Sequence, residues 1–328
     1  MTHFTKHKLS MYRPKQVILL LGLSLALPLG LSAGVRPKAT PSPLLKDSSA
    51  YRQALSYHLD RPARSMMEEL PLGNGRLGML SDGGVQRQRI TLNESSMWSG
   101  SIDSTALNPE AAKHLPEIRQ LLFAGKAKEA EALMYRTFVC GGKGSGHGSG
   151  AKTPYGSYEV GGFLQLDWTR APQLSAYRRS LDLQEGISTE RLEVAGSPYR
   201  LKTLYSSMTQ DVQVLHIENL SPEAKSDTLR LTLSRPECGQ TAVMGGMLTM
   251  SGALSDGKGG QGLRYAILAR PVLPEGGQLI TEGQELLIVG APVVTIYVAH
   301  NTNYYDPRLP LLAKGVEQLV AADPLRVI

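Results

Sequence analysis

The residues best suited to bind a sugar lie close together in one stretch, LNESSMWSG at 92–100. Asn93 and Glu94 carry groups that hydrogen-bond to hydroxyls, and the indole of Trp98 offers a flat apolar face on which a sugar ring can stack. The same polar pair could instead fix a turn, and the indole could pack into a domain interface. The sequence therefore leaves two roles open, the edge of a pocket or interface, and plain structural support.

The acidic residues near this stretch are Glu68, Glu69, Asp82 and Glu94. Hydrolysis of a glycosidic bond with inversion needs two carboxyl groups roughly 6.5–9.5 Å apart. Glu68 and Glu69 are adjacent, so in a strand they would point to opposite faces of the sheet. For Glu68, Glu69 and Asp82 we favour a structural role, in which each carboxylate accepts backbone hydrogen bonds at a turn.

Other reactive patterns are missing from the sequence. The histidines beyond residue 33 have no His-x3-His or His-Glu-x2-His spacing, so we predict no metal site and no cofactor. The serines near Trp98 do not form a Gly-x-Ser-x-Gly elbow. The run GGKGSGHGSG at 141–150 lacks the spacing of a phosphate-binding loop and predicts a flexible loop. These histidines and serines are His58, His114, His147, His216, His300, Ser95, Ser96 and Ser99.

Strands and turns are expected to position these residues. Gly73, Gly75 and Gly78 in the run LPLGNGRLG permit tight turns and close approach of neighbouring strands. Alternating or apolar runs separated by glycine-rich turns predict strands near 77–80, 89–92, 163–168, 212–217, 229–233, 286–289 and 293–299. This pattern indicates a mainly β fold, a large antiparallel β-sandwich.

A helical section interrupts the strands. Asn108 and Pro109 predict a helix start, and Gly125 predicts its end. A second helix is predicted over 126–138, with Ala127, Ala130 and Met134 on one side. The apolar face of the first helix would consist of Leu115, Ile118, Leu121 and Leu122. We therefore expect a helix pair inserted into the sandwich.

Residues 1–33 have the pattern of an export signal. A basic start precedes an apolar run from residue 17, which ends in the small-residue sequence Leu-Ser-Ala. The alternative is an uncleaved membrane anchor, but a run of about 17 residues broken by Pro28 and Gly30 is short for a spanning helix. We expect an exported protein, periplasmic or secreted and free of the membrane after cleavage, with a proline-rich linker at 34–50.

The net charge argues against nucleic-acid binding, and the two cysteines leave open whether the chain has a disulfide. Four of the six net positive charges lie in residues 1–33, which leaves +2 for the remainder and no basis for binding nucleic acid. Cys140 and Cys238 are the only cysteines. Whether they form a disulfide stays open, since only geometry decides it.

Several motifs in order resemble the N-terminal β-domain of glycoside hydrolase family 95, the α-L-fucosidase family. The sharpest are LPLGNGRLG at 70–78 and LNESSMWSG at 92–100. LPEIRQLLFAG at 115–125 is similar to the helix pair of that family, and YGSY at 155–158 and YRRSLDL at 177–183 follow in the expected order. The resemblance covers about residues 55–304.

The resemblance implies a domain at 51–305 that supports a catalytic (α/α)6 barrel, with 306–328 as the start of a linker helix. It implies inverting hydrolysis of terminal α-L-fucosyl or related galactosyl bonds in glycans, with both catalytic groups in the barrel and none in this chain. Asn93, Glu94 and Trp98 would then lie on the side that faces the barrel, as an exposed and partly apolar patch.

Two functions follow as hypotheses. The chain is either a truncated or split part of an exported hydrolase, whose partners are a fucosylated or galactosylated glycan and a separately encoded barrel, or a stand-alone carbohydrate-binding or structural module.

Overall fold

The computed structural model describes residues 55–102, 107–140, 142, 156–235, 237, 239–305, 311 and 314–316. All of these belong to one compact unit of the chain, Asp47–Ile328. The predicted signal and linker, nearly all of the glycine-rich run, Cys238 and most of 306–328 lie outside the described residues. Among the helices that are described, none has the length and hydropathy to cross a membrane.

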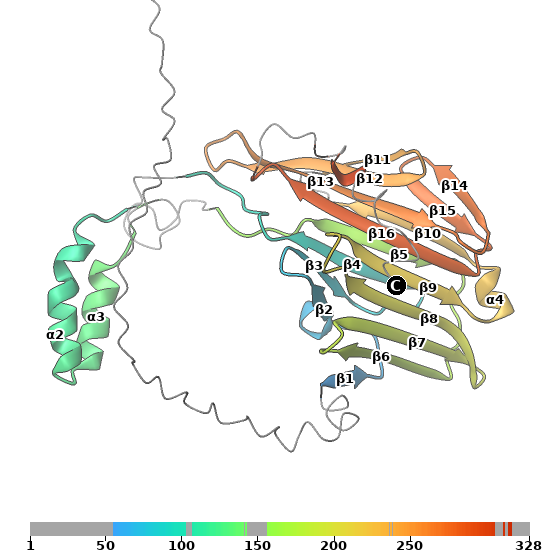
Figure 1. Cartoon of the computed structure of the whole chain (residues 1–328), viewed down its shortest axis with the longest axis horizontal. Helices are drawn as coiled ribbons and strands as arrows, with labels where there is room; N and C mark the ends of the chain where they lie inside the picture. Colours follow the sequence, from blue (N-terminus) through green and yellow to red (C-terminus); the bar gives the residue numbers. More distant parts are fainter. Residues whose placement is uncertain are drawn as a thin grey trace, which may run out of the picture. The chain divides into compact units, whose positions relative to one another are not determined.

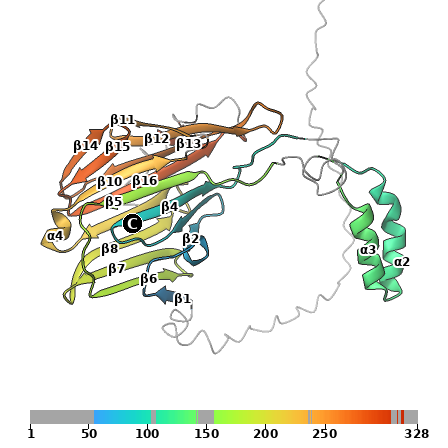
Figure 2. The same cartoon turned by 180° about the vertical axis from the view of Figure 1, so that it is seen from behind.

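Two antiparallel sheets, of nine and seven strands, make up most of the fold, which confirms the predicted mainly β, antiparallel sandwich (Figures 1 and 2). The nine-stranded sheet contains, in spatial order, β1 (Ser56–Leu59), β6 (Ala176–Asp182), β7 (Ile187–Val194), β8 (Ser197–Ser206), β9 (Gln213–Asn219), β16 (Val293–Thr302), β13 (Gln261–Val272), β12 (Met247–Ser255) and β11 (Gly239–Met244). The seven-stranded sheet contains β14 (Gln278–Glu282), β15 (Glu285–Val289), β10 (Thr228–Ser234), β5 (Gly162–Trp168), β4 (Arg87–Glu94), β3 (Leu77–Ser81) and β2 (Leu70–Gly73).

The main core lies between the two sheets. Strand β5 alternates buried and partly exposed positions along its whole length, so that Leu164 and Leu166 point inward. They join buried side chains from the facing sheet, such as Leu204 and Ile267, in one continuous cluster. Burial of each such side chain contributes roughly 1.5–3 kcal/mol, so this cluster is the main reason why the strands keep their order and register.

The outer face of the nine-stranded sheet carries a second apolar cluster. Val214, Leu268 and Tyr297 are buried there, and Leu311 and Val316 pack against them. A Cβ on Gly315 would lie 2.5 Å from a methyl carbon of Leu268, so this part of the chain lies very close to the sheet. Residues 311 and 314–316 are helical, within the segment predicted as a linker helix.

The inserted helix pair consists of α2 (Leu115–Phe123) and α3 (Ala127–Thr137), with a 3-10 turn, η4 (Ala111–His114), before them. The predicted start at Asn108 and Pro109 was therefore early, because a 3-10 turn replaces the first α-helical turn. Asn108 instead joins the two ends of the pair, since its side chain donates to the carbonyl of Thr137 at 2.9 Å.

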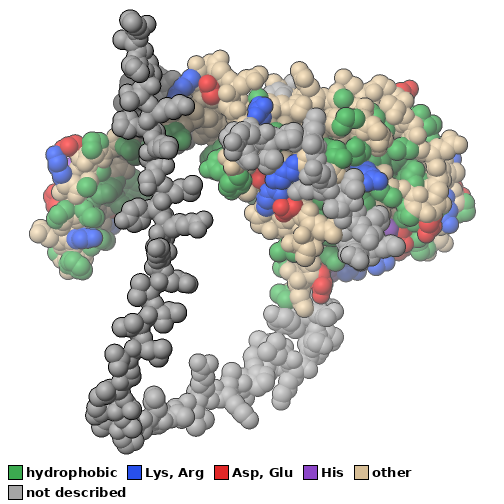
Figure 3. Space-filling view, turned by 45° about the horizontal axis from the view of Figure 1, so that its top comes forward, with side chains coloured by type: hydrophobic (Ala, Val, Ile, Leu, Met, Phe, Trp, Pro, Cys, Tyr) green, Lys and Arg blue, Asp and Glu red, His purple; other side chains and the backbone are tan. Residues whose placement is uncertain are grey.

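The buried side of the helix pair also differs from the prediction. Ile118, Ala130 and Leu133 form its small core, whereas Leu122 and Met134 are exposed. Figure 3 shows several such hydrophobic side chains on the surface of the pair. Leu133 takes the buried position that the pattern predicted for Met134, one residue along the helix.

Candidate functional site

The turn between β2 and β3 begins the region that the motifs predicted. Gly75 has a φ of 89°, and a Cβ on Gly73 would lie 2.9 Å from the carbonyl oxygen of Leu77, so both positions favour glycine. Gly78 is not crowded in this way, since the nearest atom to its Cβ position is Asn93 Cβ at 4.0 Å. The side chain of Asn74 completes the turn by accepting hydrogen bonds from the backbone N–H groups of residues 76 and 77.

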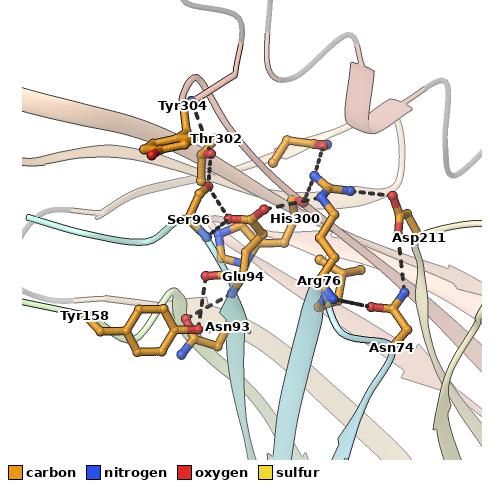
Figure 4. A network of polar contacts seen from close by, with 12 residues as sticks. Asn74, Arg76, Asn93, Glu94, Ser96, Tyr158, Asp211, His300, Thr302 and Tyr304 are labelled. Carbon is orange, nitrogen blue, oxygen red and sulfur yellow. Dashed lines mark hydrogen bonds and ion pairs between the residues drawn. The ribbon is translucent and has the colours of Figure 1, made fainter.

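This turn places Arg76 at the centre of a polar cluster, which we call the Arg76 network (Asn74, Arg76, Glu94, Ser96 and Asp211) (Figure 4). The guanidinium pairs with Asp211 at 2.7 Å and with Glu94 at 3.3 Å. It also donates to the side-chain oxygen of Asn301 on β16 at 3.0 Å. One arginine thus joins the β2–β3 turn, the end of β4, the loop before β9, and the far sheet.

Glu94 is held inside this network rather than on the surface. Its side chain is 1% exposed, and one carboxylate oxygen accepts a hydrogen bond from the backbone N–H of Ser96 at 2.7 Å. The hydroxyl of Ser96 bonds to the same oxygen and also to the hydroxyl of Thr302. Glu94 therefore fixes the turn after β4 to the end of β16 and does not reach a ligand at the surface.

Trp98 lies on the surface just beyond that turn. Its side chain is 52% exposed, and its ring lies against that of Tyr158, with 5.5 Å between centroids. Trp98, Ile102 and Tyr304 line an open groove of about 480 Å³. We call Trp98, Ile102, Tyr158 and Tyr304 the Trp98 surface.

The Arg76 network holds the backbone beneath the Trp98 surface. The hydroxyl of Tyr158 donates to the carbonyl of Glu94 at 3.2 Å. The backbone N–H of Trp98 donates to the carbonyl of Ser96 at 2.8 Å. Asn93 lies between these contacts, where its side chain accepts the backbone N–H of Glu94. Of the three residues predicted as a site, Trp98 forms the surface, Glu94 fixes the turn that precedes it, and the side chain of Asn93 bonds to the adjacent backbone N–H of residue 94.

The other acidic residues of the motif are held by structural contacts. Glu68 forms an ion pair with Arg61 at 2.6 Å and accepts the backbone N–H of Arg64. These two contacts lower the pKa of Glu68 to about 2. Burial raises the pKa of Glu69, which pairs with Arg89 at 3.3 Å.

Asp82 completes this set. Its carboxylate accepts the backbone N–H groups of Gly84 and Arg89, and burial raises its pKa. Glu68 and Asp82 thus accept the backbone hydrogen bonds that the sequence suggested, and Glu69 uses a guanidinium instead. None of these three acids lines the groove of the Trp98 surface.

His300 is fully buried beside the Arg76 network. Burial lowers its pKa to about 3, and the nearby positive charge of Arg76 acts in the same direction. Its ring lies against the backbone of Gly161, where an added Cβ would come within 2.2 Å of His300 Cε1. His300 therefore stays neutral at physiological pH and fills space between the sheets.

A second polar cluster, which sequence reasoning missed, lies deep between the sheets. We call it the Lys202 network (Ser81, Gln88, Glu190 and Lys202). Lys202 and Glu190 are direct partners in the register of β7 and β8 and form an ion pair at 2.7 Å. Gln88 on the facing sheet accepts a hydrogen bond from Lys202 and donates to Glu190. The signal for this cluster was the period-two alternation that places Lys202 on the same face as the buried Leu204.

Arg200 extends the buried polar region toward the start of β8. Its guanidinium pairs with Asp227 at 3.1 Å and donates to Asn219 at 2.7 Å. It also lies over the ring of Trp168, 4.4 Å from the centroid, which is a favourable cation–π geometry. These charges are enclosed and paired with each other, so they are not available to a ligand.

The described residues contain no group of three His, Cys, Asp or Glu side chains that could hold a metal ion. Cys140 is exposed and free. Its possible partner, Cys238, is outside the described part of the chain.

Comparison with known proteins identifies the domain. The chain is 27% identical over 175 residues to "Alpha-L-fucosidase 2" of Arabidopsis thaliana, which covers 52% of this chain and 19% of the relative. It is 29% identical over 157 residues to "Probable alpha-fucosidase A" of Aspergillus niger, which covers 46% of this chain and 18% of that protein. The matches thus span about one fifth of the length of these relatives.

A solved structure and a family model complete the comparison. A putative kojibiose phosphorylase from human microbiome matches 44% of this chain and 21% of its own, at 14% identity and a TM-score of 0.31. The model described as "Glycosyl hydrolase family 65, N-terminal domain" matches residues 58–307. Together with the α-fucosidase relatives, this match confirms the predicted resemblance, and the chain belongs to this family of glycoside hydrolase N-terminal domains.

Proposed function

We propose that this chain is the N-terminal β-domain of an exported α-L-fucosidase-like hydrolase, and that it supports a catalytic barrel which docks on the Trp98 surface. The overall reaction would be hydrolysis of terminal α-L-fucosyl or related galactosyl bonds in glycans. The barrel would supply both the general acid and the group that activates water. The α-fucosidase relatives support the choice of reaction.

The observation that carries this proposal is an exposed aromatic surface on a rigid support. Trp98, Tyr158 and Tyr304 are each about half exposed or more. Exposed apolar patches of this kind mark interaction sites, and Trp and Tyr are the residues that contribute most to protein interfaces. The Arg76 network anchors the backbone below, so little ordering would be needed when a partner binds.

A stand-alone carbohydrate-binding module is the second candidate. The groove of the Trp98 surface has the polar side chains Ser99, Ser101 and Asn303 beside its aromatic rings. Aromatic faces next to hydrogen-bonding groups also suit a sugar ring. The two candidates differ in whether Trp98 contacts a protein domain or a glycan.

The decisive experiment measures activity and association together. We expect the purified chain to show no turnover of an aryl α-L-fucoside. We expect it to retain, in a pull-down, the part of the Aspergillus niger relative that follows the whole of its N-terminal domain. Trp98→Ala should weaken this retention about tenfold or more, because Trp contacts at the centre of interfaces commonly contribute 2 kcal/mol or more. Tyr135→Ala, which removes an exposed aromatic ring from α3, is the matched control.

Two outcomes would overturn the proposal. One is clear turnover by the chain alone that Glu94→Gln abolishes. The other is binding of a fucosylated oligosaccharide by the chain alone that Trp98→Ala abolishes, which would favour the module. Export is tested separately by N-terminal sequencing of secreted protein, where an intact residue 1 would contradict it and a start near Gly34 would support it.

A further inference from the structure

A second groove lies on the outer face of β1, β6 and β7, apart from the Trp98 surface. Its volume is about 470 Å³. It is lined by polar and charged side chains from three adjacent strands and the β6–β7 turn. These are Ser56, His58, Arg178, Ser180, Asp182, Glu185, Thr189 and Arg191, with Ile187 the one apolar member.

Two arginines form one end of this groove. Arg178 and Arg191 are direct partners in the register of β6 and β7, and both are exposed. Neither has an ion pair or a side-chain hydrogen bond within the described residues. Like charges directly opposite each other on a sheet are destabilising. Packing and folding therefore do not account for this pair.

The rest of the groove is suited to hydroxyl groups. Two residues along β6 from Arg178, Ser180 lies directly between His58 on β1 and Thr189 on β7. Two residues further along β6, Asp182 lies at the other end of the groove. It is roughly 13 Å from the arginines, since a strand rises about 3.3 Å per residue. The Asp182 side chain is already engaged, since it accepts the backbone N–H groups of residues 184 and 185. The groove is thus polarised, basic at one end and acidic at the other.

We propose that this groove binds an acidic polysaccharide, with a carboxylate or sulfate group of the glycan on Arg178 and Arg191. Two guanidinium forks at neighbouring strand positions can grip one oxyanion with several charge-assisted hydrogen bonds. The hydroxyls of Ser180 and Thr189 then lie where the sugar ring beside that anion would be. The bound anion would also relieve the repulsion between the arginines. That the ligand is a glycan rests on the proposed function. That it is negatively charged rests on Arg178 and Arg191 in the groove.

Affinity electrophoresis tests the proposal and separates the two anion chemistries. The purified chain would be run in gels that contain polygalacturonate, dextran sulfate or neutral dextran. We expect retardation by at least one of the anionic polymers and none by neutral dextran. The Arg178→Gln/Arg191→Gln variant should bind about tenfold more weakly or worse, without a loss in Tm, because it removes a repulsive pair.

The matched control removes the same charge elsewhere. Arg119→Gln/Arg136→Gln changes two exposed arginines on α2 and α3 and should leave the retardation unchanged. Arg178→Lys/Arg191→Lys keeps the charge without the planar fork and should bind with intermediate strength. Three results would overturn the proposal: no retardation by either anionic polymer, an equal loss in the control, or equally strong arginine-dependent binding of duplex DNA. Because the assay measures binding, its failure is distinct from a failure of the fucosidase assays.

Discussion

The Lys202 network and the Arg76 network are built from similar groups but differ in their contact with water. In the Lys202 network both charged side chains are 1% exposed or less. Of the three charged side chains in the Arg76 network only Glu94 is enclosed, while Arg76 is 25% exposed and Asp211 43% exposed. An enclosed pair stabilises little in total, because the cost of removing both charges from water offsets their attraction. The Arg76–Asp211 pair keeps part of its hydration, so it avoids much of that cost while it lies below the Trp98 surface.

The enclosed pair has a different use, which we infer to be control of strand register. Glu190 and Lys202 lie directly opposite each other and both bond to Gln88 across the sandwich. A slip of one residue between β7 and β8 would send one of these charges to the outer face and leave the other unpaired inside. Burial lowers the pKa of Lys202, and the adjacent Glu190 opposes that shift. The network therefore favours one alignment over its neighbours more than it adds to total stability.

The largest expected effect comes from breaking this enclosed pair. Lys202→Met should lower the free energy of unfolding by about 3–5 kcal/mol, because it leaves Glu190 buried without its cation. Urea unfolding monitored by circular dichroism measures the loss. Lys202→Met/Glu190→Leu should recover a large part of it. Lys126→Met, which breaks an exposed pair on α3, is the control and should cost no more than about 1 kcal/mol. A cost for Lys202→Met as small as the control would contradict the distinction between the two networks.

A smaller loss of stability is expected when the Arg76 network is broken. Arg76→Met should cost about 1.5–3 kcal/mol, since it removes charge-assisted hydrogen bonds but lets water reach part of the site. The same urea titration applies. Arg87→Met removes an arginine that is 76% exposed in its pair with Asp167 and should cost well under that amount. If Arg76→Met and Arg87→Met cost the same, the Arg76 network does not hold the backbone below Trp98.

The last effect is absent at neutral pH and appears only on acidification, as a dependence on pH that His300 should produce. Its folded pKa of about 3 lies below the ordinary value of 6.5, so between these values the unfolded chain binds a proton that the folded chain does not. Its stabilising contribution is therefore complete above about pH 6.5 and is lost as the pH falls toward 3, by about 1.4 kcal/mol per pH unit. Unfolding midpoints of wild type and His300→Phe at pH 7 and pH 5 measure it. An unchanged pH slope in the variant would show that His300 is not the cause, and His114→Asn on η4 serves as the control.

The sequence predicted the fold better than the site, for physical reasons that particular residues make clear. Leu164 and Leu166 alternate with polar residues, so a sheet with one buried face followed directly from the spacing. The glycine-rich motif correctly marked the β2–β3 turn. No local pattern could show that Arg76 reaches Asp211, because that contact joins segments 135 residues apart in the chain. Likewise, the alternation along β8 places Lys202 on the same face as Leu204, but its partners Glu190 and Gln88 come from two other strands that no local pattern identifies.

The contact between Gly161 and His300 has an evolutionary consequence. No side chain larger than hydrogen fits at position 161 while an imidazole occupies position 300, since an added Cβ would overlap the ring. Position 161 therefore cannot change while His300 stays in place. Loss of bulk at 300 is necessary for alanine at 161 but not sufficient, because the same Cβ would also lie 2.9 Å from the carbonyl oxygen of Leu92. Among descendants of this sequence, a smaller residue at 300 should come before any residue other than glycine at 161.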